Sequence, residues 1–561
     1  MSYVTTQPQV IADAAASLAQ IRSAMASASA AAASPTTSLL AAAQDEVSAA
    51  AAALFGSYAQ EYQAVVSQAS LFHDEFVRAL TGAGNAYAVA EATNAAPALL
   101  ADPFVALIMQ GSGISIPTVP YMKSVEPYIR HLFGTPADLI PLTTPEGLYP
   151  LTQIKDLPLN QSVSTGVQIL DNALYGPQGL ISQQHLNVNV LGLSQSAVIT
   201  SLEMRHLASL GSPNTNNLSF TLLGNPMNPN GGLMSRFAGL QLPSIGLDFY
   251  GAMPTHTGYQ SNTYSFIYDG YADFPKYPIN LLADINAFAG IQYVHGNYPD
   301  LDPAHLPTGY QLVHLPTTDP NNNFYMITYS NLPILEPLRA LPILGNPLAD
   351  LIQPDLTYLI NLGYGDPHYG YSLGYADVAT PFGLLPSVDP VSFAGDMVTG
   401  AQQGVGAFVS DISAMSAPSP AGPGGLLGSL TSTFSSGGTG GTGGPSLLPS
   451  LSLNFSPDNF IHTLKTLNTD ITNTITNTSA NLYAIGLPTA DIANAVLTTL
   501  PSYNLNLFLD GVQQVVDGDP VGGLSYAFGA PIAADTALLT LAGGFELNVL
   551  LNAIGEIAGG D

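Results

Sequence analysis

The chain has 561 residues, with 10 Lys or Arg against 39 Asp or Glu, and its formal net charge is −29. Because nucleic-acid binders neutralise phosphates with clustered cations, this balance excludes a nucleic-acid partner. Hydrophobic residues make up 46% of the sequence and charged residues 9%, so most of the chain should fold, and the lack of Cys excludes disulfides and thiolate metal sites.

The first 92 residues are rich in Ala, a composition that favours helix. Apolar residues follow each other at spacings of three and four from Ile11 to Met25, which predicts one apolar helix face. Pro35 interrupts the pattern before a second, longer helix. Residues 1–92 are therefore predicted to form a helical hairpin whose apolar faces need a partner helix pair. Tyr87 and Glu91 stand four residues apart at its end, the spacing of an ordinary pair on one helix face.

This region resembles the mycobacterial PE family. The opening MSYVTTQPQVIADAAASLAQI is similar to the start of that family, with Pro8-Gln9 in place of its Pro-Glu. Tyr87 and Glu91 match the family's Tyr-x-x-x-Asp/Glu export signal. The resemblance implies secretion by a type VII system to the cell wall, cell surface or medium, and a helical PPE-like partner protein for residues 1–92. Residues 1–20 hold no Lys or Arg, so we expect no conventional signal peptide, and we expect no membrane span.

From residue 103 onward, apolar runs alternate with helical patterns. The sequence predicts strands at 104–109, 186–191, 218–223 and 264–268, and helices at 197–210 and 279–289. Strands that alternate with helices favour an α/β fold with a mostly parallel sheet, here over residues 102–400. Residues 417–448 are Gly/Ser/Pro-rich and predict a flexible linker. Residues 450–561 regain apolar periodicity and predict a small C-terminal unit of unknown role.

Two pentapeptides could carry a nucleophilic serine: Gly192-Leu193-Ser194-Gln195-Ser196, and the better letter match centred on Ser372. A hydrolase nucleophile needs a tight strand-to-helix turn with small residues two positions away on either side. Ser194 follows a predicted strand and precedes a predicted helix. Ser372 lies in a turn-rich segment, and Pro381 prevents a long helix after it. We therefore predict Ser194 as the nucleophile.

An acyl-transfer site also needs two donors for the oxyanion. One is expected from the backbone N–H of Gln195, which follows the nucleophile. The other should come from a loop after an early strand, where Ser112 lies between Gly111 and Gly113, although an ordinary turn explains Ser112 equally well.

The acid and the base should follow the serine along the chain, in that order. Asp269 and Asp273 both follow the strand predicted at 264–268, and Asp269 is favoured because it stands at the strand end. His295 comes after the acid and opens a Gly/Pro turn, so it is the predicted base. The other histidines after the acid strand that remain possible are His305, His314 and His368.

Residues 102–400 also resemble the PE-PPE hydrolase domain, through TPEGLYPLT, GLSQSAVITSLEM, YDGYADFP, PINLLADINAFAG and VHGNYP in the same order. The resemblance implies a cutinase-like α/β-hydrolase fold and a G-x-S-x-S serine. The sequence thus predicts a serine esterase or lipase acting on acyl esters through Ser194, Asp269 and His295. An acyltransferase that acylates a glycolipid or sugar alcohol, and a non-catalytic surface protein, remain alternatives. No metal or cofactor is predicted, because no zinc-type cluster or phosphate loop is present.

Overall fold

The computed structural model describes residues 103–152, 156–416 and 486–557, together with scattered positions between residues 14 and 80. Of the predicted hairpin, the longest described run is 51–59, which is helical. The predicted export residues Tyr87 and Glu91 and the predicted linker 417–448 lie outside the described residues. Residues 103–416 are called the hydrolase domain below, and residues 486–557 the C-terminal helices.

A seven-stranded sheet in the order β2-β1-β3-β4-β7-β9-β8 lies at the centre of the hydrolase domain. All neighbours pair in parallel except β8 and β9. The middle strands are buried on both faces, as expected where helices cover a parallel sheet. This architecture confirms the predicted α/β-hydrolase fold. The strands are β1 (Phe104–Ile108), β2 (Asp138–Pro141), β3 (Asn187–Leu193), β4 (Leu218–Leu223), β7 (Gln260–Phe266), β8 (Gln311–Leu315) and β9 (Asn322–Thr328).

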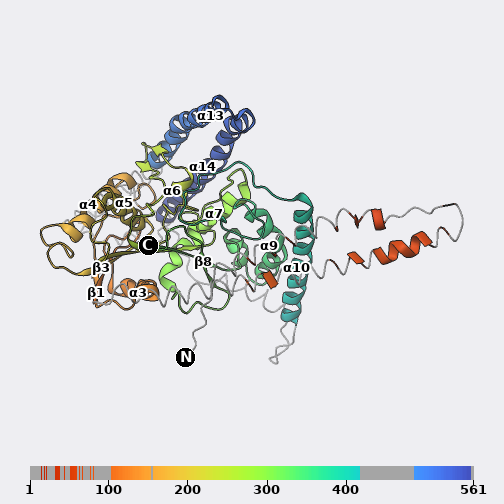
Figure 1. The fold of residues 1–561 in the computed structure, drawn as a ribbon, viewed down its shortest axis with the longest axis horizontal. Helices are drawn as coiled ribbons and strands as arrows, with labels where there is room; N and C mark the ends of the chain where they lie inside the picture. Colours follow the sequence, from red (N-terminus) through yellow and green to blue (C-terminus); the bar gives the residue numbers. More distant parts are fainter. Residues whose placement is uncertain are drawn as a thin grey trace, which may run out of the picture.

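Helices cover both faces of the sheet (Figure 1). Side chains alternate along each strand, so in β3 Val190 joins the apolar cluster under α4 and α5, and Leu191 joins the cluster that contains α3. The elements around the sheet are α3 (Val119–Phe133), α4 (Leu159–Tyr175), α5 (Gln195–Ser209), α6 (Leu233–Arg236), β5 (Gln241–Leu242), β6 (Leu247–Asp248), α7 (Leu281–Tyr293), the 3-10 helices η2 (His295–Asp300) and η3 (Pro333–Leu335), and α8 (Glu336–Arg339).

Several boundaries differ from the sequence prediction. β7 begins at Gln260, four residues before the expected start, because its first half is polar and hydropathy does not reveal it. It ends at Phe266, two residues before the expected end. α9 (Gly345–Asn361) and α10 (Pro390–Ser416) form a helical pair that was not predicted. α10 continues past residue 400, where the domain was expected to end, because the next prolines are Pro418 and Pro420.

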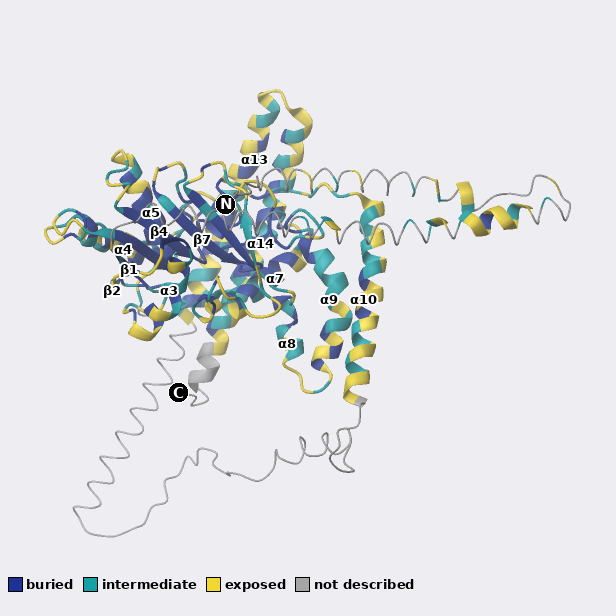
Figure 2. Ribbon diagram, turned by 60° about the horizontal axis from the view of Figure 1, so that its bottom comes forward, coloured by how far each residue is buried: buried dark blue, intermediate teal, exposed yellow. Residues whose placement is uncertain are grey.

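The C-terminal helices pack on the hydrolase domain near α7 (Figure 2). They begin with a helical stretch at 486–494 and continue with the π-helical turn η4 (Ala495–Thr499), α13 (Leu500–Val516) and α14 (Pro520–Ile557). Contrary to the expectation from sequence, Pro520–Leu551 is long and apolar enough to cross a membrane, by length and composition only. Four of its alanines are fully buried: Ala530, Ala533, Ala534 and Ala537.

Candidate active site

Ser194 occupies a strained turn between β3 and α5. Its backbone has φ 58° and ψ −115°, an uncommon conformation for a residue other than glycine. A Cβ on Gly192 would come within 2.5 Å of the carbonyl oxygen of Ser196, so the turn requires glycine there. Ser196 stands where glycine is usual, and its hydroxyl accepts a hydrogen bond from the N–H of Leu193 at 2.8 Å. This turn has the geometry of a nucleophile elbow.

The three side chains predicted as nucleophile, base and acid lie in one hydrogen-bonded chain. Ser194 Oγ lies 2.7 Å from His295 Nε2. His295 Nδ1 lies 2.9 Å and 2.8 Å from the two carboxylate oxygens of Asp269. Asp269 is fully buried and the His295 side chain is 12% exposed, so only the serine end of the chain is open to a ligand.

Two tyrosines that sequence reasoning missed hold the Asp269 carboxylate. The Tyr298 hydroxyl donates to Asp269 Oδ2 at 2.7 Å, and the backbone N–H of Tyr271 donates to Oδ1 at 3.0 Å. Gly224 allows this packing, because a Cβ there would lie 2.7 Å from the Tyr298 ring and 3.0 Å from the His295 ring. Tyr298 lies three residues after the predicted base, and no local pattern marks its role.

Asp273 lies apart from the imidazole. Its Oδ2 accepts the backbone N–H of Tyr268 at 3.0 Å, and it is fully buried. Burial raises the pKa of Asp273 well above its usual range, while the Tyr268 N–H and the charge of Arg236 act in the opposite direction. Asp269, and not Asp273, is therefore the carboxylate that faces His295.

The two predicted oxyanion residues lie beside the serine. A Cβ on Gly111, the residue before Ser112, would be 3.3 Å from Ser194 Cβ, so this loop runs directly against the elbow. The Ser112 hydroxyl donates to the side chain of Gln195 at 2.8 Å. Gln195 in turn donates to Ser162 Oγ at 2.6 Å, a support on α4 that the sequence did not reveal. Gln195 is the first residue of α5, and the first N–H groups of a helix have no hydrogen-bond partner within the helix.

The competing residues have structural surroundings. Ser372 is buried, and its hydroxyl accepts from Arg236 Nη2 at 2.8 Å. His305 pairs with Asp302 at 3.1 Å, and His368 lies 3.4 Å from Asp396. Burial lowers the pKa of His314. In the part of the chain that the structure describes, no group of three or more His, Asp and Glu residues could hold a metal ion.

An apolar pocket opens beside Ser194. Ser112, Ser194 and Gln195 are among the residues that line it. Most of the other lining residues are apolar, such as Val198 of α5 and Phe249. Small-molecule sites are typically apolar clefts with a few polar groups at one point. A hydroxyl, an imidazole and a buried carboxylate in this order can activate the hydroxyl as a nucleophile. The sheet, the elbow and this arrangement together define a protein of the α/β-hydrolase class.

Comparison with known families divides the chain in the same way. Residues 4–94 match the PE family, and residues 136–365 match the PE-PPE domain. The PE family protein PE3 of Mycobacterium tuberculosis is 43% identical over 423 residues, which cover 72% of this chain and 87% of that protein. The chain therefore belongs to the mycobacterial PE family and carries a PE-PPE domain.

A second relative in Mycobacterium tuberculosis, named Esterase PE16, is 45% identical over 409 residues, which cover 70% of this chain and 74% of that protein. The solved structure of a cutinase-like protein from Cryptococcus sp. is 15% identical, covers 30% of this chain and 79% of that one, and has a TM-score of 0.20, which adds nothing to the fold seen here. The PE-PPE domain and the esterase relative support an esterase- or lipase-like hydrolase.

Proposed function

We propose that the chain is a serine ester hydrolase that cleaves acyl esters through a covalent acyl-enzyme. The observation that carries this proposal is the 2.7 Å contact between Ser194 Oγ and His295 Nε2, on an elbow that opens into an apolar pocket. The similarity to a protein named Esterase PE16 supports the same reaction class.

In the proposed reaction, Ser194 Oγ attacks the ester carbonyl carbon while its proton passes to His295 Nε2. Asp269 holds the Nδ1–H and stabilises the imidazolium. The N–H of Gln195 and the loop at Ser112 would hold the negative oxygen of the tetrahedral intermediate. When the carbon–oxygen bond breaks, the alcohol leaves with the proton from His295. A water molecule then gives a proton to His295 and attacks the acyl carbon. The bond from this carbon to Ser194 Oγ breaks as Oγ takes the proton back from His295, and the carboxylic acid leaves.

We also propose that residues 1–92 direct the chain to a type VII secretion system and pair with a PPE-like helical protein, so that the enzyme acts at the cell wall, at the cell surface or outside the cell. The match of residues 4–94 to the PE family and the spacing of Tyr87 and Glu91 support this proposal.

The test compares wild type with Ser194→Ala on p-nitrophenyl hexanoate and with a fluorophosphonate probe that labels activated serines. Ser209→Ala is the matched control, because Ser209 lies exposed at the other end of the same helix. We expect hydrolysis and labelling in wild type and in the control, and neither in Ser194→Ala. Hydrolysis that persists in Ser194→Ala would overturn the proposal.

A further inference from the structure

The pocket beside Ser194 is built from two parts of the chain that lie far apart in sequence. Eight of its 25 lining residues come from the C-terminal helices and the rest from the hydrolase domain. The C-terminal contributors include Leu500 at the start of α13, and Leu538, Leu541, Ala542 and Phe545 along one side of α14. Without residues 486–557, the pocket would be an open apolar surface next to Ser194.

The chemistry of this second wall is uniform. All eight contributing side chains are Ile, Ala, Val, Leu or Phe, so this wall offers no side-chain hydrogen-bond donor or acceptor. The polar side chains of the pocket, among them Ser112 and Gln195, lie in the hydrolase domain. A ligand that fills the space therefore needs a polar group at the serine and a hydrocarbon chain directed toward α14, because unpaired polar groups are costly in such surroundings.

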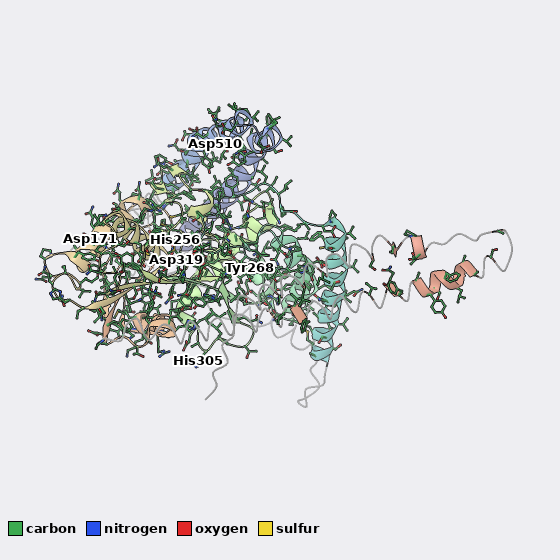
Figure 3. The ribbon with its side chains drawn as sticks, viewed as in Figure 1. Asp171, His256, Tyr268, His305, Asp319 and Asp510 are labelled. Carbon is green, nitrogen blue, oxygen red and sulfur yellow. The ribbon has the colours of Figure 1, made fainter. Side chains whose placement is uncertain are left out.

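Specific contacts fix the C-terminal helices against the hydrolase domain. The Tyr149 hydroxyl donates to Asp491 Oδ2 at 2.6 Å, and Ser244 Oγ donates to the Asp491 carbonyl oxygen at 2.8 Å. Phe545 packs edge-on against Phe288 of α7, with ring centroids 5.6 Å apart. The free end of the helices extends away from the domain, as the position of Asp510 on α13 shows (Figure 3). The wall is thus attached at the end where the pocket lies.

We infer that the C-terminal helices form the acyl-chain side of the substrate site, so that the substrate class is esters whose acyl group is a medium or long hydrocarbon chain lying between the hydrolase domain and α14. The inference rests on the proposed function for the cleavage step. Ala542 and Phe545 line the pocket from α14 and then limit the length of chain that it accepts, because each CH₂ group adds to binding only where apolar side chains bury it.

The first experiment narrows the pocket. Ala542→Phe places a ring in the space, and Leu539→Phe is the control, because Leu539 lies on the same helix, does not line the pocket and is 47% exposed. We expect the ratio of kcat/KM for p-nitrophenyl decanoate over that for the acetate to fall at least tenfold in Ala542→Phe and to stay within twofold in the control. An unchanged ratio in a folded Ala542→Phe protein would overturn the inference.

The second experiment measures binding without catalysis. The chain has no Trp, so a single Trp introduced into Ser194→Ala protein is a clean fluorescent reporter. Methyl 11-bromoundecanoate should quench Phe545→Trp and leave Leu539→Trp largely unaffected. Equal quenching of both reporters, or of neither, would refute an acyl site at α14. Absence of Ser194-dependent hydrolysis together with selective quenching would reject the proposed reaction and keep the binding site.

Discussion

The hydroxyl of Tyr298 and the imidazole of His295 share one oxygen of Asp269. Tyr298 Oη lies 2.7 Å from Asp269 Oδ2, and His295 Nδ1 lies 2.8 Å from the same atom. Tyr298 also accepts the backbone N–H of Phe266 at 2.9 Å, so it connects the end of β7 to the carboxylate. Tyr298 thereby fixes the position of the carboxylate that contacts the imidazole.

Tyr298→Phe tests this support. The substitution removes one donor to Asp269 and leaves the Phe266 N–H without its acceptor, at a cost of about 1–3 kcal/mol. We expect kcat for ester hydrolysis to fall about tenfold at a temperature where the protein remains folded, with little change in KM, and we expect a lower Tm. Tyr310→Phe serves as the control, because the Tyr310 ring stacks on Tyr329 and its hydroxyl is not among the hydrogen-bond donors to Asp269. A normal kcat combined with a lower Tm would make Tyr298 purely structural.

Asp269→Asn and Asp273→Asn should have different effects. An amide at 269 presents an N–H₂ or a weaker acceptor to His295 and disturbs its tautomer, which costs about 10⁴ in turnover in a well-studied serine protease. At 273, Asn retains an acceptor for the Tyr268 N–H, so turnover should stay within a few-fold of wild type. Steady-state kinetics and melting curves of both variants show which of the two aspartates supports catalysis. Exchanged phenotypes would make Asp273 the acid.

Ser372→Ala should leave catalysis intact despite the cleaner pentapeptide. Its hydroxyl is one acceptor among several for the buried Arg236, whose other N–H groups reach the carbonyl oxygens of Phe274 and Thr380. We expect turnover within a few-fold of wild type and a Tm lower by a few degrees, because one buried donor loses its partner. Fluorophosphonate labelling at Ser372 would contradict the assignment of Ser194.

The burial of Glu203 predicts how the stability of the protein changes with pH. It is buried in α5, and neither carboxylate oxygen has a hydrogen-bond partner. Burial, aided by the charge of Asp171, raises its pKa from 4.5 to about 8. The folded state therefore keeps the proton that the unfolded state loses above pH 4.5. The contribution of Glu203 to the free energy of unfolding is thus fully present below pH 4.5 and is lost as the pH rises through 8.

Glu203→Gln removes this titration. The Tm difference between the variant and wild type should grow by several degrees from pH 5 to pH 8.5, in favour of the variant. Asp138→Asn, at an exposed position in β2, is the control in the same calorimetric scans. A difference that stays constant with pH would show that Glu203 does not titrate in this range.

Tyr87→Ala addresses export, in the part of the chain outside the described residues. If the tyrosine belongs to a type VII signal, the variant should accumulate inside mycobacterial cells and be lost from the cell-wall and medium fractions, as measured by immunoblotting. Asn85→Ala, two residues earlier, should be exported normally. Normal export of Tyr87→Ala would remove the support for the signal.

Sequence patterns predicted β4 correctly at both ends, because four of its six residues are apolar, the other two are the small residues Ser219 and Thr221, and all six are buried. They misplaced β7, whose polar side chains bond to the neighbouring strand β9: the Ser261 hydroxyl donates to Asn322 Oδ1 at 2.7 Å, and Asn323 donates to Asn262 Oδ1 at 3.0 Å. Such pairing depends on register, which local hydropathy does not contain.

The predicted Ser194, Asp269 and His295 lie together because chain order and loop position constrain an α/β-hydrolase site. The residues that sequence reasoning missed lie far from Ser194 in the sequence. Ser162 reaches Gln195 from another helix, and Phe545 reaches the pocket from about 350 residues farther along the chain. Only the folded arrangement brings them to the serine.

The split origin of the pocket has an evolutionary consequence. The three residues of the hydrogen-bonded chain lie within residues 194–295, whereas one pocket wall comes from residues 486–557. Drift, recombination or loss in the C-terminal segment can therefore reshape the wall while the residues that would carry out bond cleavage are inherited unchanged. Duplicated copies of such a gene diversify in the lipids that they recognise when only the sequence of the C-terminal helices changes.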